Sequence, residues 1–147
     1  TEKGWMLATA ESCTGGMIAA ACTDLAGSSQ WFERGFVTYS NEAKTEMLGV
    51  PAEMIAKHGA VSEEVVRAMA EGALRHSRAQ VSIAVTGIAG PGGGSVEKPV
   101  GTVWVGWCVP HAPHAQLLAI HGSRLEIRKM TTYSALQGAV RLVAPGQ

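Results

Sequence analysis

The order of strand-like and helix-like segments constrains the fold of this chain more than any other feature. Short apolar runs typical of strands are predicted at residues 5–10, 33–39, 81–87, 101–109 and 114–122. Helical spacing and capping signals predict helices at residues 16–25, 41–48, 51–58, 63–78 and 124–143. Helices interspersed between strands in this order indicate one layered α/β domain, over residues 1–147, with a mixed sheet.

Composition limits the classes of function. The 147 residues contain 12 Lys and Arg against 12 Asp and Glu, so the formal net charge is zero. No basic stripe of the kind that nucleic-acid binding requires is visible, and no apolar run reaches membrane-spanning length. Cys13, Cys22 and Cys108 are odd in number and form no CxxC pair. We therefore expect no nucleic acid, membrane, disulfide framework or zinc site, and a reducing, cytoplasmic location.

Three segments that could carry chemistry each follow a predicted strand, at residues 11–16, 39–44 and 86–95. Ligands of open α/β sheets bind beyond the carboxyl ends of the strands. The shared placement predicts that these segments, although distant in sequence, form one site.

The first segment is a turn from a strand into a helix. Ser12 is the candidate nucleophile, and Thr14, Gly15 and Gly16 could present free backbone N–H groups to an anion or a developing oxyanion. The alternative is that Ser12 or Thr14 only caps the helix. Cys13 is a weaker candidate, because a cysteine nucleophile usually needs a histidine base and none is close in sequence.

The second segment contains Tyr39 and Lys44. A lysine in the first turn of a helix lies at the unfavourable, positive end of the helix dipole. If Lys44 is also partly buried, its pKa is lowered and it could act as a general base, with Tyr39 relaying a proton or donating a hydrogen bond. The alternative is a solvated lysine beside a core tyrosine.

The third segment is rich in glycine. Its amides could wrap around a phosphate, with Gly87, Gly90 and Gly92 as candidates and Thr86 at the end of the preceding strand. The segment matches neither a P-loop nor a GxGxxG fingerprint. The alternatives are a flexible surface loop for the glycines and a simple hydroxyl cap for Thr86.

Four stretches in this order, "ATAESCTGG", "GFVTYSNEAK", "TGIAGPGGG" and "KPVGTVWVG", resemble the CinA C-terminal domain family. Members of that family include nicotinamide mononucleotide (NMN) deamidases. The terminal "HGSRLEIR" resembles the family's Gly-x-Arg…Arg element, carried here by Gly122, Arg124 and Arg128. The family pattern usually has Phe and Asp where this chain has His121 and Ser123.

The resemblance implies a three-layer α/β/α sandwich with a mixed, mostly parallel sheet, in a homo-oligomer (dimer or higher). It also implies an amidohydrolase that converts NMN and water into nicotinic acid mononucleotide and ammonia, with no cofactor or metal. Positions matching Ser12, Tyr39, Lys44 and Thr86 are implicated in catalysis in the family. Two alternatives stay open: a non-catalytic module that binds a nucleotide or protein, and an amidase for another carboxamide.

Overall fold

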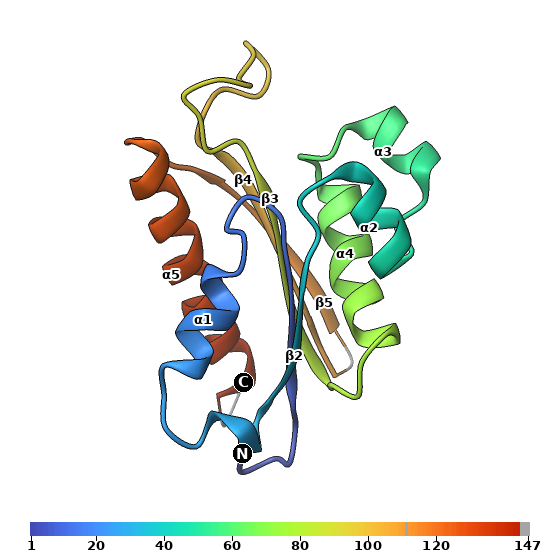
Figure 1. Cartoon of the computed structure of the whole chain (residues 1–147), viewed down its shortest axis with the longest axis vertical. Coiled ribbons are helices and arrows are strands. Elements are labelled where there is room, and N and C mark those ends of the chain that lie inside the picture. Colours follow the sequence, from blue (N-terminus) through green and yellow to red (C-terminus); the bar gives the residue numbers. More distant parts are fainter. Residues whose placement is uncertain (111, 145–147) are drawn as a thin grey trace.

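A five-stranded sheet runs through the centre of the molecule (Figure 1). The computed structural model describes residues 1–110 and 112–144. The strands are β1 (Leu7–Glu11), β2 (Phe32–Val37), β3 (Val81–Gly87), β4 (Thr102–Val109) and β5 (Ala112–Ala119). The helices are α1 (Met17–Thr23), α2 (Asn41–Leu48), α3 (Ala52–His58), α4 (Glu63–Arg75) and α5 (Arg124–Val143), with a short 3-10 helix, η1 (Ser28–Gln30). Each predicted strand and helix is present, and several bounds differ.

The strand order is β2-β1-β3-β4-β5. β1 pairs in parallel with both β2 and β3, whereas β4 pairs antiparallel with both β3 and β5. The mixed sheet is confirmed, and four of its five strands run in the same direction, with β4 as the exception. β4 runs against β3 because a glycine-rich loop rather than a crossover helix connects the two strands.

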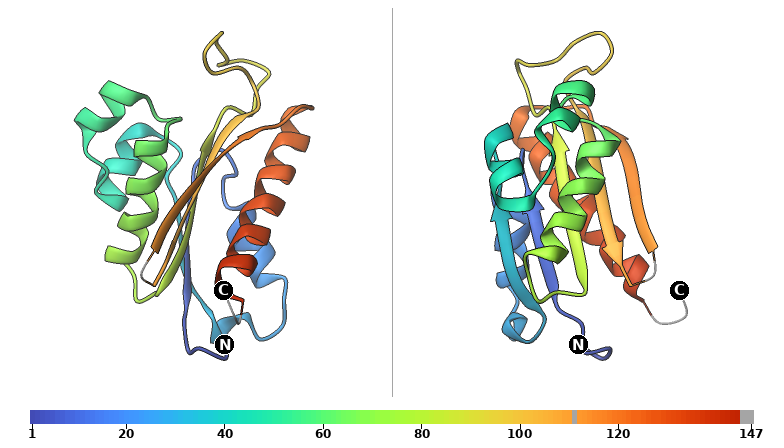
Figure 2. Two further views of the ribbon diagram at one scale, coloured as in Figure 1. Left: turned by 180° about the vertical axis from the view of Figure 1, so that it is seen from behind. Right: turned by 90° about the vertical axis from the view of Figure 1, so that its right-hand side faces the viewer.

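Helices cover both faces of the sheet and give the expected three layers. α4 packs on β1, β3, β4 and β5 with α2 and α3 against it, while α1 and α5 cover the opposite face (Figures 1 and 2). The side chains of Trp104 and Trp107 belong to the two different cores, as a spacing of three on a strand requires. The Trp107 indole N–H donates to the Ala135 carbonyl of α5 at 2.9 Å.

The last hairpin begins earlier than predicted. β5 starts at Ala112, so Pro113 lies within the strand and opposite Cys108 rather than in the turn. β5 is an edge strand that pairs only with β4. Proline is tolerated there because one side of an edge strand needs no ladder hydrogen bond.

Helix α5 begins with a capping box. The Ser123 hydroxyl accepts the Glu126 N–H at 3.2 Å, and the Ser123 N–H donates to the Glu126 carboxylate at 2.7 Å. Ser and Asp are both strong N-cap residues. Ser123 therefore serves as the N-cap at the position where the family pattern has Asp.

Candidate active site

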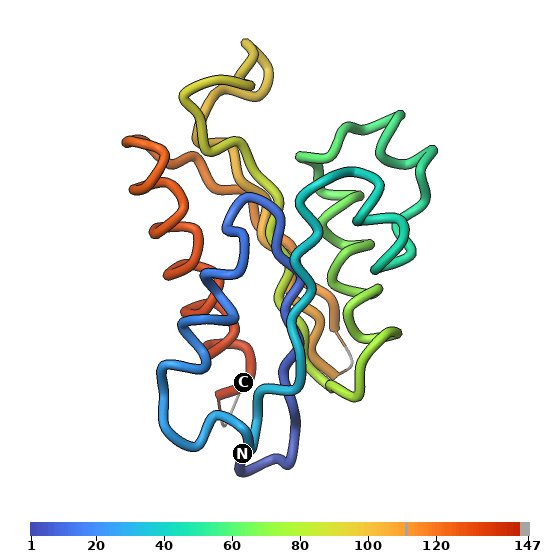
Figure 3. The backbone as a smooth tube through the Cα atoms, viewed as in Figure 1, coloured from blue at the N-terminus to red at the C-terminus, as the bar shows by residue number. Residues whose placement is uncertain are grey.

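The turn after β1, the loop after β2 and the loop after β3 meet at one end of the sheet (Figure 3). They do so because β1 runs parallel to both neighbours, which brings three carboxyl ends together. A cavity of about 240 Å³ lies there. Its lining includes five of the predicted site residues: Ser12, Tyr39, Lys44, Thr86 and Gly87.

Ser12 and Lys44 are in direct contact at this end of the sheet. The Lys44 amine and the Ser12 hydroxyl oxygen are 3.0 Å apart, although the two residues are 32 positions apart in sequence. Ser12 is 8% exposed and Lys44 1% exposed. A hydroxyl next to a buried amine is the arrangement that a serine nucleophile with a lysine base requires.

The cap of α2 fixes the position of Lys44. The Ser40 hydroxyl accepts the Ala43 N–H at 3.0 Å and starts the helix, so Lys44 lies in its first turn as predicted. The Lys44 amine also donates to the Thr38 and Tyr39 carbonyls, at 3.0 Å and 3.1 Å. These carbonyls can stabilise the ammonium that forms when Lys44 accepts a proton.

Burial lowers the pKa of Lys44 below its ordinary value of 10.5, against the raising effects of Cys13 and the Glu42 carboxylate. The lowered pKa agrees with the sequence-based expectation, and its main cause is burial. A lysine in this position is uncharged in more of the protein molecules at neutral pH than an exposed lysine is.

Tyr39 is not interposed between Ser12 and Lys44. Its carbonyl accepts from the Lys44 amine, whereas its hydroxyl lies 3.5 Å from an Arg124 guanidinium nitrogen at the exposed side of the cavity. The geometry therefore favours direct proton transfer between Lys44 and Ser12 over a relay through Tyr39. The Thr86 hydroxyl donates to the Ala60 carbonyl at 2.9 Å, which ties β3 to the segment between α3 and α4.

A buried carboxylate that sequence reasoning missed occupies the start of α1. Glu11 is 1% exposed and accepts from the Thr14 hydroxyl at 2.6 Å. It also accepts from the backbone N–H groups of Gly16, Ile18 and Ala19. A carboxylate at a helix start is the signal that could have identified it.

The backbone N–H groups of Gly15 and Gly16 are therefore not free. Gly15 donates to the Ser12 carbonyl at 3.1 Å, and Gly16 to the Glu11 carboxylate at 3.2 Å. The expectation that these two amides meet an oxyanion is wrong, because protein acceptors already take them. Both glycines have positive φ, at 57° and 109°, so their task is to let the chain turn tightly into α1.

The glycine-rich loop contributes less to the cavity than expected. Gly87 lines it, but Gly90 and Gly92 are not among its lining residues. The Gly90 carbonyl accepts from Arg124 at 2.7 Å, which attaches the loop to the start of α5. Gly92 is exposed and has no atom within 4 Å of an added Cβ position.

Two arginines of α5 complete the surroundings of the site. Arg124 lines the cavity, and Arg128 donates to the Cys13 and Thr14 carbonyls at 3.0 Å and 3.3 Å. Sequence reasoning noted both arginines only as parts of a motif. The approach of Arg128 to the turn after β1 spans most of the chain and has no local signal.

Cys13 lines the same cavity but is a poor nucleophile. Burial raises the pKa of its thiol to about 11, against the lowering effects of its own backbone N–H and of Arg128. The reactive species of a cysteine is the thiolate, which is scarce at neutral pH when the pKa is raised this far. Ser12 therefore remains the better candidate.

Comparison with known proteins identifies the family of the chain. The family model of the CinA C-terminal domain matches residues 1–143. This chain belongs to that family. The nicotinamide-nucleotide amidohydrolase PncC of Escherichia coli K12 is 54% identical over 136 residues, which cover 92% of this chain and 82% of PncC.

Other members of the family are similar in sequence or structure. A putative competence-damage inducible protein of Symbiobacterium thermophilum is 53% identical over 144 residues, and this chain spans about a third (34%) of its length. The crystal structure of the competence/damage inducible protein CihA from Agrobacterium tumefaciens superposes with a TM-score of 0.94 at 49% identity, covering 97% of this chain and 87% of that one. These matches confirm the CinA-like α/β fold.

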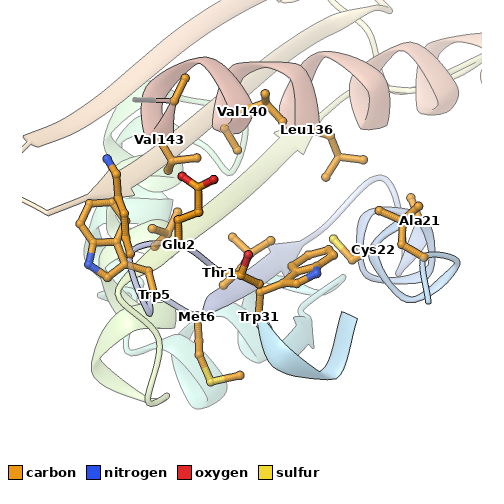
Figure 4. Close-up of a pocket in the computed structure, with 16 residues that line it drawn as sticks. Thr1, Glu2, Trp5, Met6, Ala21, Cys22, Trp31, Leu136, Val140 and Val143 are labelled. Carbon is orange, nitrogen blue, oxygen red and sulfur yellow. The ribbon is translucent and has the colours of Figure 1, made fainter. Parts of the chain in front are cut away.

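A second and larger cavity, of about 720 Å³, lies at the other end of β1 and β3. Figure 4 shows Trp5, Trp31, Cys22, Leu136 and Val140 around it. Burial raises the pKa of the Cys22 thiol to about 11. Its lining includes Lys3 but no serine, so it lacks the serine–lysine pair found at Ser12.

Within residues 1–110 and 112–144, no group of three or more potential metal ligands comes together. The helices of this part of the chain include none that is both long and apolar enough to cross a membrane. Cys13, Cys22 and Cys108 are all free.

Proposed function

We propose that this chain is an amidohydrolase that removes the carboxamide nitrogen of NMN, giving nicotinic acid mononucleotide and ammonia. The observation that carries the proposal is the 3.0 Å contact between the buried Lys44 amine and the Ser12 hydroxyl. The name of the PncC relatives, nicotinamide-nucleotide amidohydrolase, supports the choice of substrate.

In the first half of the reaction, uncharged Lys44 takes the proton of the Ser12 hydroxyl as the oxygen attacks the carboxamide carbon. The carbon–nitrogen bond then breaks, and Lys44 returns the proton to the leaving ammonia. In the second half, water attacks the Ser12 ester and gives a proton to Lys44. The acid leaves, and Ser12 regains its proton from Lys44.

Arg124 and Gly87 are suited to hold the rest of the nucleotide. The cavity volume of about 240 Å³ lies below the range of about 300–1,000 Å³ that is typical for ligands of drug size. The pyridine ring would therefore enter the cavity while the phosphate stays at its rim. The exposed guanidinium of Arg124, anchored on the Gly90 carbonyl, can bind a phosphate there.

Ammonia release from NMN, compared with release from nicotinamide, nicotinamide riboside and NAD, tests this proposal. We expect turnover of NMN, and we expect Ser12→Ala to abolish it while leaving the circular dichroism spectrum unchanged. Near-normal turnover by Ser12→Ala would refute the mechanism. Release from another carboxamide alone would refute the substrate, and stabilisation of the fold by NMN without any turnover would identify a binding module instead.

We also propose that residues 1–147 act as one domain, in the cytoplasm and as a homo-oligomer (dimer or higher). The single sheet with helices packed on both faces and the three free cysteines support the first two proposals. Light scattering during size-exclusion chromatography tests the third, and a monomer at micromolar concentration would refute it.

A further inference from the structure

The turn that carries Ser12 is held from the side of α5 by Arg128. Its Nε donates to the Cys13 carbonyl at 3.0 Å and its Nη2 to the Thr14 carbonyl at 3.3 Å. Arg128 is half-buried and does not line the cavity. It therefore contacts the backbone of the turn without reaching the place where a substrate would lie.

These contacts fix the direction of two peptide units. In a trans peptide the N–H and C=O point in opposite directions. The Cys13 carbonyl points at Arg128, so the N–H of Thr14 points away from α5. The Ser12 carbonyl accepts from Gly15 at 3.1 Å, so the N–H of Cys13 points away from Gly15.

Neither of these two N–H groups donates to another residue among those that the structure describes. The next three, of Gly15, Gly16 and Met17, all donate to protein oxygens. Thr14 is fully buried and does not line the cavity, whereas Cys13 does, so the Cys13 N–H is the one that a substrate oxygen can reach. The unused donors immediately follow the candidate nucleophile, where the N–H groups of an oxyanion hole occur in other serine hydrolases.

We propose that Arg128 is a positioning residue for the hydrolysis. It holds the Thr14 carbonyl and with it the Thr14–Gly15 peptide, whose N–H donates to the Ser12 carbonyl. The Ser12–Cys13 peptide is thereby fixed so that the Cys13 N–H, at the cavity, faces the oxygen of the carbonyl that Ser12 attacks. Arg128 itself touches neither substrate nor Ser12. This inference rests on the proposed function for its role in NMN turnover, but its geometric part concerns only the reactivity of Ser12.

Covalent labelling of Ser12 by a small alkyl fluorophosphonate tests the inference without NMN. In that reaction the Ser12 oxygen bonds to phosphorus, fluoride leaves, and Lys44 takes the hydroxyl proton. The labelling rate is measured by intact mass for the wild type, Arg128→Met, Arg128→Lys and Lys129→Met. Lys129 is an exposed cation of the same helix, so its variant is the matched control.

We expect Arg128→Met to slow labelling by about 10²-fold, the cost of a lost oxyanion donor. Arg128→Lys should restore part of the rate, because an ammonium can donate to one carbonyl but cannot form the two-nitrogen fork. Lys129→Met should label at the wild-type rate. In steady-state assays with NMN, Arg128→Met should lower kcat in the same proportion and leave KM unchanged, because the donor that Arg128 positions acts on charge that develops only in the transition state.

Three results would overturn the inference. One is labelling of Arg128→Met at the wild-type rate. Another is a wild type that is not labelled at Ser12. The third is loss of labelling in both Arg128 variants in parallel with lost thermal stability and lost binding of nicotinic acid mononucleotide, which would indicate a purely structural role. Labelling that depends on Arg128 in a protein that releases no ammonia from NMN would support the inference and refute the proposed function.

Discussion

The two cavities at opposite ends of β1 and β3 differ in size and in chemistry. The larger one, about 720 Å³, is lined by tryptophans and aliphatic side chains of α1, α5 and the first residues of the chain. The smaller one, about 240 Å³, contains a buried serine–lysine pair and an arginine at its rim. The end of the sheet with the smaller cavity thus pairs a candidate nucleophile with a candidate base.

Strand direction explains this difference. At the carboxyl ends of β1 and β3 the chain enters tight turns, which expose backbone groups and place Ser12 and Thr86 at the cavity. At the amino ends the same strands begin among packed apolar side chains such as Leu7 and Val81. Convergent polar groups, rather than volume, therefore mark the smaller cavity as the candidate site.

The largest difference between the two ends of the sheet is expected in catalysis, from Lys44→Met. Methionine keeps the length of the buried stem but cannot accept a proton, so kcat for NMN should fall by about 10²–10⁴-fold. The exposed Lys57 of α3 provides the control, and Lys57→Met should retain wild-type kcat. Steady-state ammonia release measures both. Loss of less than half of the activity in Lys44→Met would mean that another group is the base.

The next effect is a pH dependence of catalysis, which Lys44 should cause at the same end of the sheet. The base must be uncharged, so kcat/KM should rise with pH through an apparent pKa below 10.5, the ordinary value for lysine. A kcat/KM that does not change between about pH 5 and 9 would contradict the assignment of Lys44 as the base.

The lowered pKa of Lys44 also makes the free energy of unfolding depend on pH. The folded pKa of Lys44 lies below the unfolded one, so between these two values the unfolded chain binds more protons. The free energy of unfolding attributable to Lys44 should therefore rise with pH up to 10.5 and be lost as the pH falls through the lowered pKa. Chemical denaturation of the wild type and Lys44→Met measures this, and equal slopes for the two proteins would contradict it.

The main parts of the site were predictable from the sequence because strand ends are local signals. Ser12 and Lys44 follow strand-like runs, Thr86 lies at the end of one, and parallel strands bring their carboxyl ends together. The pairing of α5 with the turn after β1 was not predictable in this way. Arg128 and Cys13 are 115 residues apart, and nothing near either residue indicates the other.

The role of Glu11 shows a second limit of sequence reasoning. The glycine pair correctly indicated a tight turn, but pattern alone does not reveal which acceptor takes the N–H groups of Gly15 and Gly16. The Ser12 carbonyl takes the first and the Glu11 carboxylate the second, and β1 extends one residue further than predicted, to Glu11. The strand order beyond β3 was likewise not predictable, because no periodic pattern in the sequence indicates that the glycine-rich loop brings β4 back beside β3.

A smaller effect at the polar end is expected from Glu11→Gln. The carboxylate accepts from four donors, whereas an amide offers one acceptor oxygen and turns an NH₂ group toward the remaining N–H groups. The free energy of unfolding should fall by about 1–3 kcal/mol. Glu46→Gln, at an exposed position of α2, is the control and should change it by less than about 0.5 kcal/mol. Equal effects of the two substitutions would show that Glu11 does not hold the turn.

The smallest effect is expected at the apolar end, from Val140→Thr. Val140 lines the larger cavity and is 66% exposed, so an isosteric hydroxyl there meets solvent and needs no buried partner. The free energy of unfolding should change by less than about 0.5 kcal/mol, and kcat and KM for NMN should match the wild type. Thermal denaturation and steady-state assays measure these quantities. A clear loss of turnover without loss of stability would make the larger cavity part of the catalytic site. It would contradict the assignment of catalysis to the smaller cavity alone.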